Sequence, residues 1–176
     1  MNQVRFSLCS TVDFPKVLPL FESYADIFPF QQKRLILQQI SQVLEEEVHP
    51  QSLFRAEHEN STIGFLGTRR EEQDPSRFQL FGFIIKRGYQ GQGIGTNLLF
   101  FAIPHICRNG GRTLSVIVKS HYPPATRTFY RKHGFKEILD EHYTGASNVE
   151  DRLFTCTLAT HPAARLALST AGTMRA

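Results

Sequence analysis

The sequence predicts an α/β (α+β) protein with six to seven strands and about four helices. Two observations support this fold class. The chain has 176 residues, of which 41% are hydrophobic and 20% charged, which suits a single soluble core. Its apolar residues alternate with a period of two in some segments and recur at i, i+3 and i+4 in others, the patterns of strands and of helices.

Seven segments have the apolar pattern of strands. Val4, Phe6 and Leu8 alternate with polar residues in the first of them. The polar turn 59–61 separates two short apolar segments and therefore predicts a hairpin. The predicted strands cover 3–9, 53–56, 63–66, 78–85, 114–118, 135–139 and 152–158.

Four segments have helical spacing. Pro19 should make the first helix short or break it, and Pro104 should remove one backbone hydrogen bond from the third. The sequence Asn109-Gly110-Gly111 and Gly134 should end the third and fourth helices with left-handed caps. The helices are expected to begin near Asp13, Gln31, Ile94 and Pro123, and the third to bury Ile94, Leu98, Phe101, Ala102 and Ile106.

We expect one domain over 1–158 and a poorly ordered tail over 159–176, which contains no acidic residue. Cys9, Cys107 and Cys156 include no C-x-x-C pair, which favours reduced thiols in the cytoplasm. The histidines lack metal-ligand spacing, so no metal is expected. No signal peptide or bilayer-spanning run is visible, so we expect a cytoplasmic monomer or homodimer that does not bind a membrane.

The formal net charge of +4 is distributed unevenly along the chain. Residues 1–74 carry −4, residues 75–136 carry +10 with no carboxylate, and residues 137–176 carry −2. The basic middle segment predicts an anionic ligand that is bound locally. A solvated basic face is the alternative.

The glycine-rich loop at 89–96, Tyr-Gln-Gly-Gln-Gly-Ile-Gly-Thr, is the most informative motif. Its glycines allow close approach of the backbone, and the helix that follows offers N–H groups to a phosphate. The dinucleotide fingerprint does not fit, because Thr96 or Leu98 stands where glycine is required. The nucleoside-triphosphate loop does not fit either, because Gly93-Ile94 replaces Gly-Lys.

Two motifs resemble the GNAT N-acetyltransferase superfamily. Gln90, Gly93 and Gly95 match its acyl-coenzyme A loop, and the segment 129–135, Phe-Tyr-Arg-Lys-His-Gly-Phe, matches its Phe-Tyr-x-x-x-Gly-Phe pattern. The resemblance in element order extends over 3–158. It implies a central mixed, mostly antiparallel sheet and acetyl-CoA as co-substrate.

The resemblance also implies which residues bind the co-substrate. It assigns the pyrophosphate to the backbone of the glycine loop and the pantetheine arm to the strand before it. The outer phosphate needs basic side chains. These expectations name Gln90, Gly91, Gly93, Gly95 and Thr96 for the pyrophosphate, Phe83 and Ile85 for the pantetheine, and Lys86, Arg87, Arg127 and Arg131 for the outer phosphate.

Acetyl transfer to an amine requires a general acid for the leaving thiolate and a base for the amine. Tyr130 matches the catalytic tyrosine of the family and is our candidate for the acid. Gln79 stands on the strand where many members have a glutamate base. The base is therefore left open between His121, Glu57 or Glu59, and a water chain.

Three functional classes follow from these residues. The first is an N-acetyltransferase that acts on a small-molecule or peptide primary amine. The second is a non-catalytic acyl-CoA-binding regulatory module, which is favoured by the missing strand glutamate and by Pro123. Pro123 and Thr126 stand where the family often has an asparagine and an alanine. The third acetylates aminoacyl-tRNA, as the pI near 9.1 allows. A cationic acceptor is expected from the acidic residues Glu22, Asp26, Glu45, Glu46, Glu47, Glu141, Glu150 and Asp151.

Overall fold

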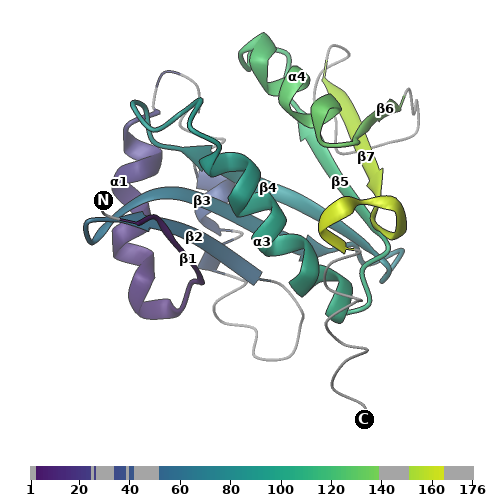
Figure 1. Cartoon of the computed structure of the whole chain (residues 1–176), viewed down its shortest axis with the longest axis horizontal. Helices are drawn as coiled ribbons and strands as arrows, with labels where there is room; N and C mark the ends of the chain where they lie inside the picture. The colour runs from purple at the N-terminus through teal and green to yellow at the C-terminus, as the bar shows by residue number, and fades with distance from the viewer. Residues whose placement is uncertain are drawn as a thin grey trace. The chain divides into compact units, whose positions relative to one another are not determined.

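The computed structural model describes residues 3–24, 26, 34–38, 40–41, 52–138 and 151–164. Its strands are β1 (Arg5–Leu8), β2 (Ser52–His58), β3 (Ser61–Arg70), β4 (Arg77–Ile85), β5 (Thr113–Val118), β6 (Lys136–Ile138) and β7 (Arg152–Thr157). Its labelled helices are η1 (Thr11–Asp13), α1 (Phe14–Glu22), α3 (Ile94–Arg108), α4 (Pro124–Lys132) and η2 (Leu158–Thr160). Within this described part, the strands form one seven-stranded sheet in the order β1-β2-β3-β4-β5-β7-β6 (Figure 1).

Contacts within the chain divide it into two compact units. The first unit contains Met1–Arg69 and Phe81–Ala102, and the second contains Arg70–Leu80 and Ile103–Ala176. Strand β4 and helix α3 each contribute residues to both units.

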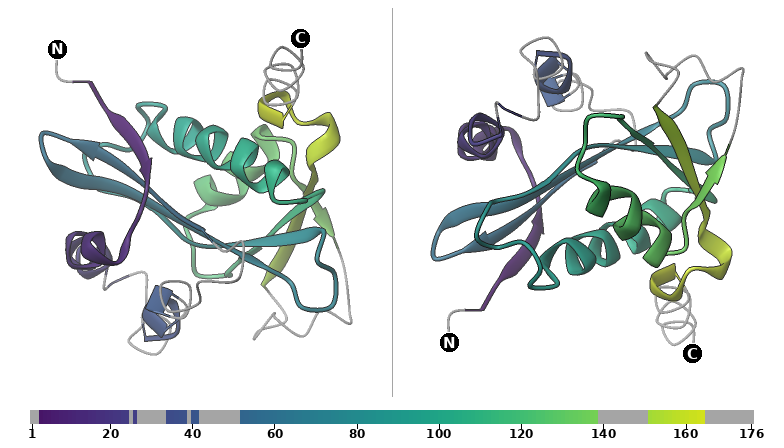
Figure 2. Two further views of the ribbon diagram at one scale, coloured as in Figure 1. Left: turned by 90° about the horizontal axis from the view of Figure 1, so that it is seen from below. Right: turned by 90° about the horizontal axis from the view of Figure 1, so that it is seen from above.

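In the first unit, β1, β2 and β3 form an antiparallel meander. Glu59 and Asn60, with φ of 49° and 63°, form the two-residue turn between β2 and β3 and confirm the predicted hairpin. Helix α1 and the helical residues 34–38 and 40–41 lie on one face of these strands, and α3 begins on the other (Figure 2). Phe21, Phe54 and Phe65 are completely buried between the layers.

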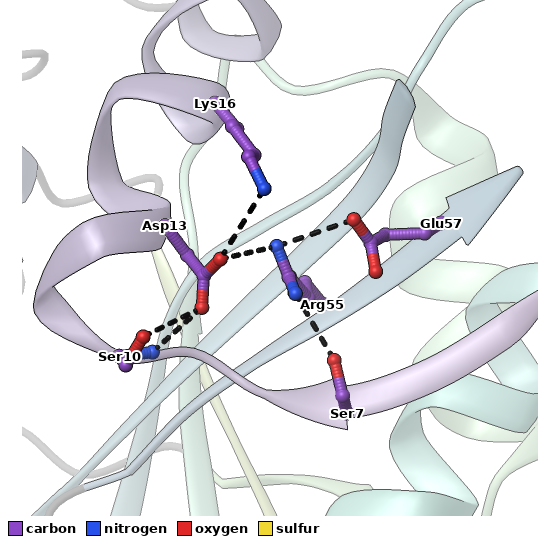
Figure 3. Close-up of polar contacts among 6 residues, drawn as sticks. All are labelled: Ser7, Ser10, Asp13, Lys16, Arg55 and Glu57. Carbon is purple, nitrogen blue, oxygen red and sulfur yellow. Dashed lines mark hydrogen bonds and ion pairs between the residues drawn. The ribbon is translucent and has the colours of Figure 1, made fainter. Parts of the chain in front are cut away.

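A charged network joins the start of α1 to β2 in the first unit (Figure 3). The guanidinium of Arg55 lies 2.6 Å from a carboxylate oxygen of Asp13 and 3.2 Å from one of Glu57. The N–H and hydroxyl of Ser10 donate to the other oxygen of Asp13 at 3.0 and 2.8 Å. These bonds lower the pKa of Asp13, the bond from the Ser10 backbone having the largest effect. The network therefore keeps Asp13 ionised where the chain enters α1.

In the second unit, β4 pairs in parallel with β5 over Arg77–Leu80, and β7 pairs antiparallel with both β5 and β6. Helix α4 packs against β7 through the rings of Tyr130 and Phe154, whose centroids are 6.2 Å apart. The mixed, mostly antiparallel sheet confirms the predicted fold class.

The structure refines three sequence predictions. Pro19 lies inside α1 without breaking it. Phe101, predicted to be buried, is 41% exposed, because it lies at the margin of the buried face, beside the rings of Phe6 and Phe54. Of the helix predicted to begin at Gln31, residues 34–38 and 40–41 are helical, and the rest lies outside the described residues.

The segment after β7 is described as far as residue 164. It forms η2 and then a helical turn in which Ala163 and Ala164 are buried. The remainder of the predicted tail lies outside the described residues. No helix in the described part of the chain is long and apolar enough to cross a membrane.

Candidate active site

Strand β4 changes its backbone geometry just before the glycine loop. Gly82 has a φ of +59°, and a Cβ at this position would lie 3.2 Å from Phe65 and from two other buried side chains. Any other residue would be both strained and crowded, so this position requires glycine. The positive φ interrupts the regular pleat directly before Phe83 and Ile85, the residues expected to contact the pantetheine arm. The sequence signal for this position is a lone glycine within an apolar strand.

The loop between β4 and α3 turns at Gly91 and Gly93, and each of these glycines has open space around it. Gly91 and Gly93 have φ of 75° and 78°, in the left-handed region that favours glycine. A Cβ on either would meet no atom within 4 Å in the described part of the chain. The side chain of Gln92 donates to the Gly88 carbonyl at 2.8 Å and holds the loop closed on itself.

The first turn of α3, directly after this loop, presents backbone N–H groups as hydrogen-bond donors for a ligand. Its first helical bond runs from the Asn97 N–H to the Gly93 carbonyl, at 3.0 Å. The N–H groups of Ile94 and Gly95 precede this bond and so have no acceptor within the helix. The first turn also contains no acidic residue. These donors, with the positive end of the helix dipole, fit a pyrophosphate group.

The side chain of Gln90 does not point toward an external ligand. Its Nε2 donates to the hydroxyl of Tyr24 at 2.6 Å and to the carbonyl of Ile85 at 3.2 Å. The Tyr24 hydroxyl in turn donates to the Ile85 carbonyl at 2.7 Å. The Ile85 oxygen is therefore already engaged by two donors from the protein. Sequence reasoning missed Tyr24, which is 61 residues from Ile85 along the chain.

The four basic side chains considered for the outer phosphate have different surroundings. Arg87 forms an exposed ion pair with Asp26, and Arg131 pairs with Glu137 at 2.7 Å. Lys86 is exposed and Arg127 half-buried. The roles of all four in binding phosphate stay predictions.

Tyr130 lies on α4 of the second unit and is only 4% exposed. Its ring is 5.2 Å from that of Phe135 and 6.2 Å from that of Phe154. Burial raises the pKa of its phenol above the ordinary value, and the nearby Tyr122 adds to this effect. The hydroxyl is therefore protonated at neutral pH, which is the state that a general acid needs.

The candidates for the base differ in their availability. Glu57 is paired with Arg55 in the network of Figure 3, and Glu59 is exposed in the β2–β3 turn. His121 is exposed after β5, with its ring edge-on to that of Tyr122 at 4.9 Å. Gln79 is buried on β4 and cannot accept a proton from an amine.

The loop between β5 and α4 is held by a buried carboxylate that sequence reasoning did not assign to this role. Asp151, whose side chain is 1% exposed, pairs with Lys119 at 2.8 Å. It also accepts a hydrogen bond from the Ser120 N–H at 2.9 Å. No local pattern predicts this pair, because its members are 32 residues apart. Asp151 thereby fixes the segment that carries His121 and leads to Tyr130.

His133 is the C-cap of α4. It is 8% exposed, and its Nδ1 donates to the Phe129 carbonyl at 2.7 Å. This histidine therefore contributes a hydrogen bond to the end of the helix.

Comparison with known proteins decides the family. The acetyltransferase (GNAT) domain family matches residues 24–147, more than half of the chain. The chain belongs to the GNAT acetyltransferase family. No curated protein sequence matches it.

Solved structures of other GNAT proteins share the fold. A GNAT acetyltransferase from Desulfovibrio desulfuricans is 18% identical with a TM-score of 0.72, and the match covers 89% of this chain and 99% of that one. PaiA N-acetyltransferase from Thermoplasma acidophilum, solved with coenzyme A, is 15% identical with a TM-score of 0.68, covering 88% and 99%. The ribosomal-protein-S18-alanine N-acetyltransferase of Escherichia coli is 21% identical with a TM-score of 0.67, covering 89% and 94%.

As a GNAT acetyltransferase, the protein is an enzyme that uses acetyl-CoA as its co-substrate. The prediction of the superfamily and of this co-substrate is confirmed. Within the described residues, no group of three or more His, Cys, Asp or Glu side chains could hold a metal ion. The assignment of individual GNAT site residues stays a proposal.

Proposed function

We propose that this GNAT enzyme transfers the acetyl group of acetyl-CoA directly to a primary amine, with Tyr130 as the general acid. The observation that carries the proposal is the buried, protonated phenol of Tyr130 within the Phe-Tyr-x-x-x-Gly-Phe motif. The glycine loop supports it, because the open space beside Gly93 and the donors of α3 suit the pyrophosphate of the co-substrate.

In the proposed reaction, the lone pair of the neutral amine attacks the thioester carbonyl carbon and forms a tetrahedral oxyanion. When the oxyanion collapses, the C–S bond breaks and the sulfur leaves with the electron pair. Tyr130 donates its proton to this sulfur, so free coenzyme A and the N-acetylated amine are released. The proton lost by the amine restores the Tyr130 phenol through solvent.

The amine must be neutral to attack, although an alkylamine has a pKa of about 10.4. We assign the removal of its proton to His121 or to water. The ring of His121 is exposed and has a nitrogen that can accept a proton, whereas Glu57 is held by Arg55.

We propose a cationic amine as the acceptor, supported by fewer acidic residues than the sequence suggested. Asp26 and Asp151 are each neutralised by a basic side chain of the protein. Glu22 is exposed on α1, and the other acidic residues of the expected set lie outside the described residues. The choice of a cationic acceptor therefore rests on less negative charge than the sequence total suggests.

A panel of amines tests the proposed function. Cationic amines, such as polyamines, aminoglycosides and amine-terminated peptides, are assayed beside neutral and anionic amines and an aminoacyl-tRNA. Release of free thiol from acetyl-CoA is followed, and the acetylated product is identified by mass. We expect release to depend on a cationic primary amine. Reaction of neutral or anionic amines alone would overturn the choice of acceptor.

The protein's own thiols should not interfere with this assay. Burial raises the pKa of Cys9 to about 12 and that of Cys156 to about 11, and it also raises the pKa of Cys107. Near neutral pH, Cys9 and Cys156 should therefore hold at least about a hundredfold less thiolate than an unperturbed cysteine with a pKa near 8.5. We expect both to react slowly with a thiol-specific reagent in the native enzyme, and all three cysteines to react after unfolding in urea. Fast labelling of two or more native thiols would contradict this prediction.

A further inference from the structure

A cluster of four side chains in the first unit joins the segment after α1 to the glycine loop. Tyr24 and Asp26 follow α1, while Arg87 and Gln90 follow β4. We call these four residues the Tyr24 clasp. Its parts are about 61 residues apart in the sequence, so the clasp exists only in the folded protein.

The centre of the clasp is the buried hydroxyl of Tyr24, which both accepts and donates a hydrogen bond. Tyr24 is 4% exposed, and its hydroxyl both accepts from Gln90 Nε2 at 2.6 Å and donates to the Ile85 carbonyl at 2.7 Å. Gln90 Nε2 reaches the same carbonyl at 3.2 Å. These three groups form a closed triangle that fixes the side chain of Gln90 and the last residue of β4.

The outer part of the clasp is more exposed. The guanidinium of Arg87 lies over the Tyr24 ring, 4.8 Å from its centroid, and pairs with Asp26. More than half of each charged side chain is exposed, so the ion pair should contribute little. The hydroxyl of Tyr24 is therefore the element on which the clasp depends.

We propose that Tyr24 is a positioning residue that holds the glycine loop in its co-substrate-binding conformation through Gln90 and Ile85. The inference rests on the proposed use of the loop for acetyl-CoA. Gln90 directly precedes Gly91, whose φ is 75°, so its bond to the Ile85 carbonyl ties this turn of the loop to the end of β4. A loop held in this way loses less conformational freedom when it binds phosphate.

The test is the conservative change Tyr24→Phe in the full chain. Removing a hydroxyl that makes two neutral hydrogen bonds should weaken coenzyme A binding about fivefold to tenfold, measured as Kd by calorimetry. The KM for acetyl-CoA should rise by the same factor, while kcat at saturation and the KM for the amine change less than twofold. A purely structural role would not separate the two KM values in this way.

Two further variants complete the experiment. Gln90→Ala, at an exposed position, should weaken coenzyme A binding to a similar extent, and adding Tyr24→Phe should then have little further effect. If Tyr24→Phe does not fold, Gln90→Ala alone decides through the same Kd. Tyr89→Phe is the matched control: its hydroxyl lies 3.4 Å from His58 Nδ1, outside the clasp, and its loss should leave Kd unchanged.

The possible outcomes are distinguishable. Wild-type Kd in both Tyr24→Phe and Gln90→Ala overturns the positioning role and leaves the proposed function intact. Additive effects of the two changes, or an equal effect of Tyr89→Phe, also overturn it. Failure of the wild-type protein to bind coenzyme A overturns the proposed use of the loop, and the inference with it.

Discussion

Replacing Tyr130 with phenylalanine should lower kcat by about 10²–10⁴-fold and change the Kd for coenzyme A less than twofold. The change removes the proton donor and keeps the ring, whose packing against Phe135 and Phe154 should maintain the fold. Steady-state thiol release measures kcat, and a melting curve checks that α4 is intact. Turnover within about threefold of the wild type would exclude Tyr130 as the general acid.

The pH dependence of kcat provides a second test of Tyr130. Because burial raises its pKa above the ordinary 10.0, the phenol stays protonated while the amine becomes neutral with rising pH. We therefore expect kcat to rise with pH and then level off, with no descending limb below about pH 10. A descending limb near pH 8 would mean that a stronger acid than Tyr130 protonates the thiolate.

Replacing Asp151 with alanine should produce the largest loss of stability among single polar changes discussed above. It would leave the partly buried Lys119 ammonium without its partner and remove the acceptor of the Ser120 N–H. Breaking a buried ion pair in this way costs about 3 kcal/mol of unfolding free energy. Urea denaturation measures the loss, and activity should also fall because the loop that carries His121 is no longer held.

The control for Asp151 is the more exposed pair of Arg131 and Glu137, in the same unit. Glu137→Gln weakens this contact, in which the side chains are 55% and 26% exposed, and also the contact of Glu137 with Arg152 at 3.2 Å. It should cost less than about 1 kcal/mol for each pair. Asp151→Asn keeps the size of the side chain and should fall between the two. Equal small losses for Asp151→Ala and Glu137→Gln would show that the buried pair has no special role.

The strands and the glycine-rich loop could be predicted from sequence, because both depend on local chemistry. The alternation around Phe6 identifies β1, and the polar turn at Glu59 and Asn60 identifies the hairpin. Gly91 and Gly93 stand in a glycine-rich motif that predicts a loop, and their positive φ angles explain why glycine is required. These features depend on the period and backbone freedom of neighbouring residues.

The rest could not be predicted, because it depends on contacts between distant segments. Neither the bond from Tyr24 to Ile85 nor the pair of Lys119 and Asp151 has a local signal. This ion pair also reduces the negative charge that an acceptor would meet. The sequence counts Asp151 as a free negative charge, but Lys119 neutralises it in the fold. The total charge of a sequence segment therefore overestimates the negative charge available to an acceptor.

Direct acetyl transfer to an amine, with Tyr130 as the general acid, is tested most directly by a single-turnover experiment. It uses acetyl-CoA and an amine that the panel identifies as an acceptor. We expect one equivalent of free coenzyme A and one of N-acetylated amine for each acetyl-CoA consumed, with both products formed about 10²–10⁴-fold more slowly in Tyr130→Phe. Binding of coenzyme A with no thiol release for any amine would instead show a non-catalytic acyl-CoA-binding module and contradict the account.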